Sequence, residues 1–138
     1  DLDEAVDGVI YSAFGFSGQK CSAASRVIVL SDIYDRFVER LVETAKSIEI
    51  KASENPKAYY GPVVDQDAYQ RLLQVIEDGS KNHQVLFKGQ VPEGGYFVPP
   101  TIFGNVKHTD RMAQEEFFGP ILSVIKADDI EQAIEFLN

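Results

Sequence analysis

The feature that most constrains the fold is the alternation of helix-patterned segments with short runs of branched apolar residues. Three such runs, at Arg26–Leu30, Gln84–Lys88 and Ile121–Ile125, predict strands. Strands buried in a parallel sheet typically consist of continuous Val, Ile and Leu runs. The order of elements therefore predicts a three-layer α/β fold with a largely parallel sheet and flanking helices.

Between these runs, apolar residues recur every three or four positions, which is the spacing of one helix face. The predicted helices run from Leu2 to Ala13, from Ile33 to Ile48, around Tyr69–Ile76, and from Asp128 onward, with Asp78-Gly79-Ser80 weakening the third. Two further short strands are predicted at Tyr96–Val98 and Thr101–Phe103, separated by Pro99 and Pro100, and residues 107–120 are expected to be mostly irregular.

The first and last residues both fall inside helical patterns. The chain starts at Asp1 without Met, and no Gly or Pro ends the last helical run before Asn138. We expect a piece of a longer protein; a short terminal helix that frays is the alternative.

Composition excludes several classes of function. The 138 residues carry 22 acidic and 13 basic side chains, and the net charge of -9 argues against nucleic-acid binding. No apolar run approaches the roughly 20 residues of a membrane span. The single cysteine cannot form an internal disulfide, which fits a cytoplasmic location.

That cysteine, Cys21, lies in a polar, glycine-rich loop between the first helix and the first strand. A free thiol is only about 3% ionised at pH 7, so a nucleophilic cysteine needs help. A helical turn from Cys21 through Ser25 would direct backbone amides at the sulfur and favour the thiolate, and Lys20 adds a positive charge. The alternative is a buried, inert cysteine.

The loop resembles the active-site signature of the aldehyde dehydrogenase superfamily. That signature has an aromatic residue, then Gly-Gln, one variable residue, the cysteine and small residues. The matching residues here are Phe14, Gly18, Gln19, Lys20, Cys21, Ser22 and Ala23. The resemblance implies that Cys21 attacks an aldehyde.

A second match lies at Gln114–Pro120, which resembles the Glu-x-Phe-Gly-Pro segment of the same superfamily. The resemblance implies that Glu116 binds the hydroxyls of the nicotinamide ribose and that Phe118 packs beside the cofactor. A carboxylate accepts two charge-assisted hydrogen bonds from a diol. Without the resemblance, Glu115-Glu116 is a solvated acidic pair, and Phe117-Phe118 belongs to the core.

Within the superfamily, the segments Ser12–Ala23 and Phe97–Phe103 are most similar to 1-pyrroline-5-carboxylate dehydrogenases. These enzymes oxidise glutamate semialdehyde to glutamate in proline breakdown. The resemblance implies that Ser22 hydrogen-bonds the substrate carboxylate; a serine that starts a helix is the alternative. A succinate-semialdehyde or aliphatic aldehyde dehydrogenase is the second choice.

The resemblance also implies parts that this sequence lacks. The general base, the second oxyanion donor and the cofactor-binding domain are expected upstream, and no G-x-G-x-x-G or P-loop is present. Residues 1–138 are therefore interpreted as a partial catalytic domain. NAD, or NADP, is expected in the full-length enzyme, a homo-oligomer, but not bound to this chain alone.

Other classes of protein fit less well. A cysteine hydrolase needs a histidine beside Cys21, whereas His83 and His108 lie on segments predicted to be at the surface. One cysteine and two scattered histidines match no zinc spacing, so no metal site is expected. Gly15–Gly18 fits the GXXG of an RNA-binding KH module, but the acidic charge opposes it. A non-catalytic interaction module remains an alternative.

Overall fold

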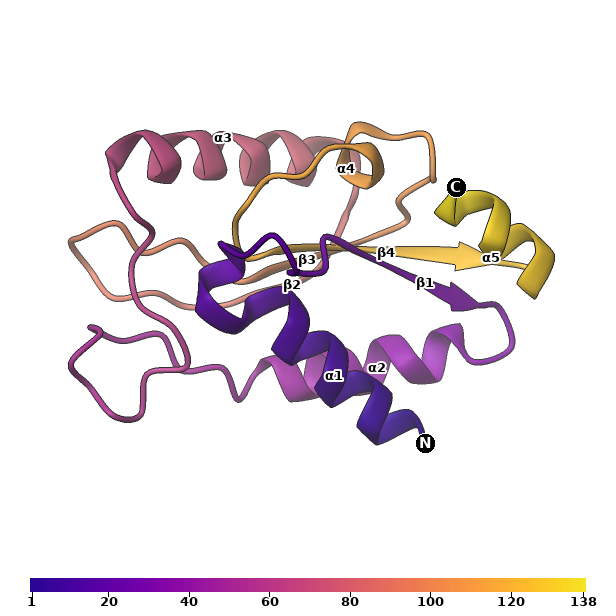
Figure 1. Ribbon diagram of the computed structural model, residues 1–138, viewed down its shortest axis with the longest axis horizontal. Coiled ribbons are helices and arrows are strands. Elements are labelled where there is room, and N and C mark those ends of the chain that lie inside the picture. The colour runs from indigo at the N-terminus through magenta and orange to yellow at the C-terminus, as the bar shows by residue number, and fades with distance from the viewer.

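The computed structural model describes residues 1–138 and contains one four-stranded sheet between two layers of helices (Figure 1). The strands are β1 (Arg26–Leu30), β2 (Gln84–Lys88), β3 (Thr101–Gly104) and β4 (Ile121–Ala127), in the order β1-β4-β3-β2. Strand β4 runs parallel to both of its neighbours, and only β2 is antiparallel to β3. The predicted α/β fold with a largely parallel sheet is confirmed.

Two helices cover one face of the sheet, and the other helices lie on the opposite face (Figure 1). The helices are α1 (Leu2–Phe14), α2 (Tyr34–Ala45), α3 (Gln66–Asn82), α4 (Arg111–Gln114) and α5 (Ile130–Leu137). Strand β4 is buried on both faces: Leu122 and Val124 pack on the side of α1 and α2, whereas Ile121 and Ile125 pack on the side of α3. This two-sided burial explains its unbroken apolar sequence.

The predicted strand at Tyr96–Val98 is wrong, because these residues form no strand. Pro99 and Pro100 follow, and proline has no N–H for a sheet ladder. The carbonyl of Val98 instead accepts a hydrogen bond from the buried Tyr60 hydroxyl, at 2.9 Å. A side chain thus takes the place of a neighbouring strand.

Helix α3 continues through Asp78–Ser80, where the sequence predicted a weak point. A Cβ atom at Gly79 would lie 2.8 Å from Cζ of Phe103, so the glycine lets α3 approach β3 closely. This packing compensates for the cost of a glycine inside a helix, which is about 1 kcal/mol relative to alanine.

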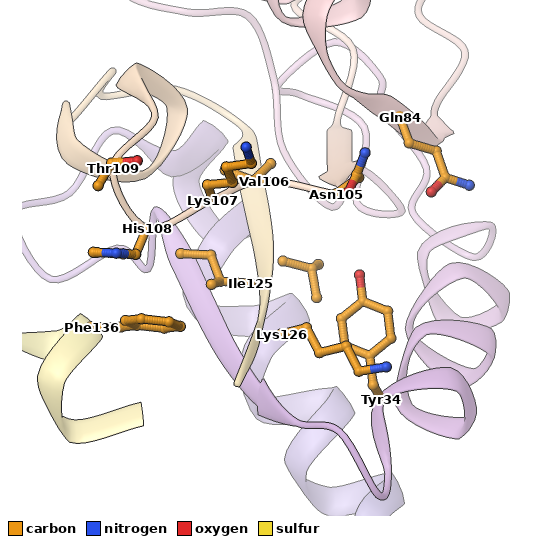
Figure 2. Close-up of a pocket in the computed structure, with 11 residues that line it drawn as sticks. Tyr34, Gln84, Asn105, Val106, Lys107, His108, Thr109, Ile125, Lys126 and Phe136 are labelled. Atoms are coloured by element: carbon orange, nitrogen blue, oxygen red, sulfur yellow. The ribbon is translucent and has the colours of Figure 1, made fainter. Parts of the chain in front are cut away.

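The last helix, α5, has no buried residue. It is held to the rest of the chain by stacking of Phe136 on His108, with ring centroids 4.2 Å apart (Figure 2). The Leu137 carbonyl accepts a hydrogen bond from the Arg26 guanidinium at 3.3 Å. The apolar side chains of Ile130 and Ile134 remain exposed.

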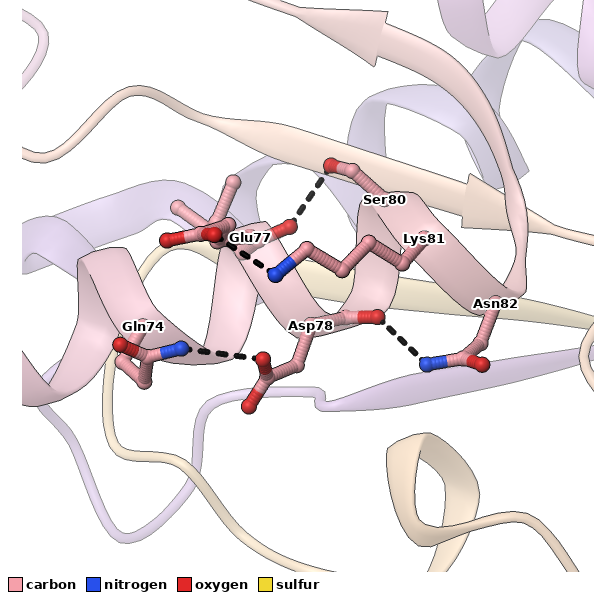
Figure 3. Close-up of polar contacts among 7 residues, drawn as sticks. Gln74, Glu77, Asp78, Ser80, Lys81 and Asn82 are labelled. Carbon is pink, nitrogen blue, oxygen red and sulfur yellow. Dashed lines mark hydrogen bonds and ion pairs between the residues drawn. The ribbon is translucent and has the colours of Figure 1, made fainter.

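Helix α3 is polar on its outer surface. There Lys81 pairs with Glu77 at 2.7 Å, and the amide of Gln74 donates to Asp78 at 3.0 Å (Figure 3). Exposed pairs of this kind contribute little to stability, so the helix depends mainly on its buried face. None of the helices combines the length and the hydropathy that a membrane-spanning segment requires.

Candidate active site

Cys21 lies in a tight turn that joins the end of α1 to β1, and its free thiol is exposed. The turn is closed by a hydrogen bond from the Ala23 N–H to the Lys20 carbonyl, at 3.0 Å. The Ala24 N–H donates to both the carbonyl and the hydroxyl of Ser12, each at 3.2 Å. These bonds fix the base of the turn to α1 and leave its tip, with the sulfur, open to solvent.

The helical turn expected from Cys21 to Ser25 is absent. The chain enters β1 directly, because the Ser25 carbonyl accepts the N–H of Ser123 on β4 at 3.0 Å. The ammonium of Lys20 lies 5.0 Å from the ring centroid of Tyr11, a cation–π distance. Because no helix begins at Cys21, no set of helical backbone N–H groups points at the thiol.

A strained segment precedes the cysteine turn. Phe16, Ser17 and Gly18 have φ values of 57°, 59° and 67°, three left-handed residues in succession within the 3-10 turn Gly15–Gly18. Each non-glycine residue in this conformation costs about 1–2 kcal/mol. Such strain persists only where surrounding contacts fix the backbone.

Residues 61–64 supply those contacts. The Ser17 side chain is 3% exposed, and its hydroxyl donates to the Gly61 carbonyl at 3.1 Å. The side-chain oxygen of Gln19 accepts the Val64 N–H at 3.2 Å. The two bonds hold the chain on both sides of Gly18, directly before the cysteine turn.

The segment that carries Glu116 and Phe118 packs against the same turn. A Cβ atom at Gly18 would lie 2.2 Å from the Gly119 carbonyl oxygen, so the two glycines touch backbone to backbone. A small pocket is lined from one side by Gly18 and Ala23–Ser25, and from the other by Glu116–Gly119. The fold thus brings together the two motifs that the sequence singled out.

The two phenylalanines of this segment have different environments. Phe117 is 5% exposed and belongs to the core, and its carbonyl accepts a hydrogen bond from Arg71 on α3 at 2.6 Å. Phe118 has a φ of 54° and is 40% exposed. The reading of both side chains as core is therefore wrong for Phe118. Glu116 is exposed and forms no hydrogen bond or ion pair, whereas Glu115 pairs with Arg111.

The backbone around the thiol has free donors. The N–H groups of Cys21 and Ser22 donate to no atom of the chain. Ser22 is exposed, and because no helix begins there, its reading as a helix-start serine is wrong. Two amides and one hydroxyl are thus available to a bound molecule next to the sulfur.

Neither histidine lies near this turn. Cys21 precedes β1, at the amino ends of the parallel strands, whereas His108 follows β3 at their carboxyl ends. His83 lies at the same end as His108, with its Nδ1 3.8 Å from Asp110. Both histidines are half-buried, and neither forms a Cys–His pair. No three metal-ligating side chains cluster in the structure.

Sequence reasoning did not identify Ser17, Gly61 or Arg71 as parts of the site. Each acts through a hydrogen bond to a segment more than 40 residues away, at separations of 44 and 46 positions. The only local signal was the pair of glycines that flank Phe16 and Ser17.

Comparison with known proteins agrees with this geometry. The whole chain, residues 1–138, matches the model of the aldehyde dehydrogenase family. The 1-pyrroline-5-carboxylate dehydrogenase of Bacillus subtilis is 41% identical over 139 residues, and that of Staphylococcus saprophyticus is 42% identical. Each match covers all of this chain, but the chain spans only 27% of the length of each relative.

Solved structures show the same fold. Proline utilization A from Bdellovibrio bacteriovorus, inactivated by N-propargylglycine, is 67% identical with a TM-score of 0.99, and the match covers all of this chain and 14% of that one. A Thermus 1-pyrroline-5-carboxylate dehydrogenase with bound NAD is 42% identical with a TM-score of 0.94, over all of this chain and 27% of that enzyme. The chain belongs to the aldehyde dehydrogenase family.

Proposed function

We propose that this chain is the cysteine-bearing part of the catalytic domain of an NAD-dependent 1-pyrroline-5-carboxylate dehydrogenase, with Cys21 as its nucleophile. The observation that carries the proposal is the exposed thiol on a turn packed, through Gly18 and Gly119, against the segment of Glu116 and Phe118. The names of the relatives support the substrate, glutamate semialdehyde.

The chemistry assigned to Cys21 is attack of its thiolate on the aldehyde carbon, which gives a tetrahedral thiohemiacetal. The oxyanion of this intermediate needs donors held in place. The free backbone N–H of Cys21 is suited to this role, because nothing in the chain competes for it. Loss of hydride then leaves a thioester on Cys21, which a water molecule hydrolyses with the help of a general base.

The side chains of Glu116 and Phe118 fit a nicotinamide cofactor. The Glu116 carboxylate is exposed and has no partner in the chain, so both oxygens are available to a ribose diol. The exposed ring of Phe118 offers a flat apolar surface beside it. When bound, NAD accepts the hydride that leaves the thiohemiacetal, and NADP is the second choice.

Ser22 is assigned to substrate recognition. Its exposed hydroxyl stands next to the nucleophile and is not engaged within the chain, so it is free to donate to the carboxylate of glutamate semialdehyde. An aliphatic aldehyde has no such carboxylate, which gives Ser22 a role in specificity rather than in chemistry.

The proposal places the base, the second oxyanion donor and the cofactor domain in other parts of a longer, homo-oligomeric protein. We therefore expect the 138-residue chain alone to bind NAD weakly or not at all and to show no turnover. Measurable aldehyde oxidation by the purified chain would contradict this division of the site.

The test of the nucleophile uses the chain as it stands. Iodoacetamide should alkylate Cys21 of the folded chain near pH 7 at a rate that unfolding in urea does not increase. Labelling that becomes fast only in urea would indicate a buried, inert thiol and would favour the non-catalytic interaction module.

The test of the reaction uses the longer protein that carries this chain. Cys21→Ser should reduce glutamate-semialdehyde oxidation by at least about 1000-fold, as loss of a covalent nucleophile does. Ser22→Ala should raise KM for glutamate semialdehyde but leave KM for propionaldehyde unchanged. A preference for succinate semialdehyde or propionaldehyde in the parent would favour one of the other aldehyde dehydrogenases.

A further inference from the structure

We propose a second ligand site in this chain, a pocket for a small aromatic compound with an anionic group, at the carboxyl ends of β3 and β4. The pocket has a volume of about 470 Å³, within the range of small-molecule sites. It lies at the opposite end of the parallel strands from Cys21 and does not depend on the dehydrogenase proposal.

The topology of the sheet creates this pocket. Strand β3 pairs with β4 only as far as Phe103 and Ser123, whereas β4 continues to Ala127, so the end of β4 projects beyond its neighbour. The chain leaving β3 runs as the segment Asn105–Thr109 beside this projecting end, and this segment and the end of β4 form the walls of the pocket.

The lining of the pocket has a polar, cationic end and an aromatic end. Figure 2 shows Lys126 beside Tyr34 at one end, His108 over Phe136 at the other, and Ile125 between them. The Lys126 ammonium lies 5.4 Å from the ring centroid of Tyr34. Burial raises the pKa of the Tyr34 hydroxyl, which therefore stays protonated and able to donate at neutral pH.

The charges select an anion. Lys126 forms no ion pair in the structure, and neither does Lys107, which also lines the pocket. No aspartate or glutamate is among the lining residues, although the chain has 22 of them. Two unpaired ammonium groups beside one pocket of an acidic protein attract an anion.

The apolar part of the pocket selects a planar group. The half-buried rings of His108 and Phe136, stacked with their centroids 4.2 Å apart, form the apolar end of the pocket. We therefore assign the site to an aromatic compound with a phosphate or carboxylate group, which contacts Lys126 and Tyr34 while its ring packs beside Phe136.

The test is a titration of the ¹⁵N-labelled chain with phenyl phosphate, benzoate and inorganic phosphate at constant ionic strength, followed by NMR. Phenyl phosphate should cause saturable shifts of the amides of Asn105–Thr109 and Lys126, with a Kd at least about tenfold below that of inorganic phosphate, because the ring adds apolar burial. Benzoate binding as tightly as phenyl phosphate would identify carboxylates as the ligand class.

The decisive variant is Lys126→Gln, which keeps most of the side-chain volume but removes the charge. It should weaken phenyl phosphate by about tenfold or more, as expected for loss of one charge-assisted hydrogen bond. Lys88→Gln, an exposed lysine on β2, is the matched control and should change nothing. Shifts that do not saturate, or an equal Kd in Lys126→Gln whose spectrum shows the native fold, would overturn the proposal.

Discussion

Gly18 and Gly119 touch backbone to backbone, since a Cβ atom on Gly18 would lie 2.2 Å from the Gly119 carbonyl oxygen. The contact joins the cysteine turn to the segment of Glu116 and Phe118, which lie far apart in sequence. The contact leaves no room for a side chain on Gly18, and it holds the cysteine turn against the segment of the proposed cofactor residues.

Gly18→Ala is therefore expected to be strongly destabilising. The new methyl group meets a backbone carbonyl that cannot rotate away, and alanine disfavours the φ of 67°. We expect a loss of about 3–5 kcal/mol in the free energy of unfolding, measured by urea denaturation. Gly94→Ala is the matched control: its φ is 77° but nothing lies within 4 Å, so it should cost only about 1 kcal/mol. Equal losses in the two variants would show that the contact with Gly119 is unimportant.

Gly119 is also packed against α3. A Cβ atom there would lie 2.3 Å from Cδ2 of Leu72, a fully buried side chain. Gly119→Ala should cost about 1–3 kcal/mol through overpacking, and Leu72→Ala about 2–5 kcal/mol through the cavity it leaves. Because the new methyl partly fills that cavity, the double variant should lose less than the sum of the two. Additive losses in a double-mutant cycle would contradict the contact.

Ser17 permits a direct test of the strain before the cysteine turn. Ser17→Ala keeps the left-handed strain but loses the hydrogen bond to Gly61, and should cost about 1–2 kcal/mol. Ser17→Gly loses the same bond but relieves the strain at a φ of 59°, so it should be about 1 kcal/mol more stable than the alanine variant. The order of the two urea midpoints is the measurement, and the reverse order would exclude backbone strain at this position.

Much of the fold could be predicted from the sequence, because its signals are local. The apolar runs at β1, β2 and β4 form strands as predicted, although only β4 is largely buried. Tyr96–Val98 was mispredicted because the buried Val98 has no partner strand, and its carbonyl instead accepts a hydrogen bond from the distant Tyr60 hydroxyl. Likewise, helix α3 passes Gly79 only because Phe103 of β3 fills the space beside it.

The sequence singled out the residues of the candidate site but not the residues that hold them in place. Cys21, Glu116 and Phe118 stand in motifs that a single sequence displays. The helical turn assumed to activate the thiol was wrong, because pairing of Ser25 with Ser123 draws the chain straight into the sheet. Contacts between distant segments determine the local backbone conformation here, and composition and residue spacing do not reveal those contacts.

Tyr60 should make the stability of the chain fall in alkaline solution. Burial raises the pKa of its hydroxyl well above the ordinary value of 10. Above about pH 10 the unfolded chain loses this proton while the folded chain keeps it, so the free energy of unfolding decreases by up to about 1.4 kcal/mol per pH unit. Below pH 10 both states are protonated and the contribution is constant.

Tyr60→Phe should cost about 1 kcal/mol at pH 7, since the hydrogen bond to Val98 is lost, but its free energy of unfolding should decline less steeply between pH 10 and 11. Tyr11→Phe, at an exposed ring, should follow the parent profile in urea unfolding across the same range. If Tyr60→Phe and the parent declined in parallel above pH 10, the buried hydroxyl would not be the titrating group.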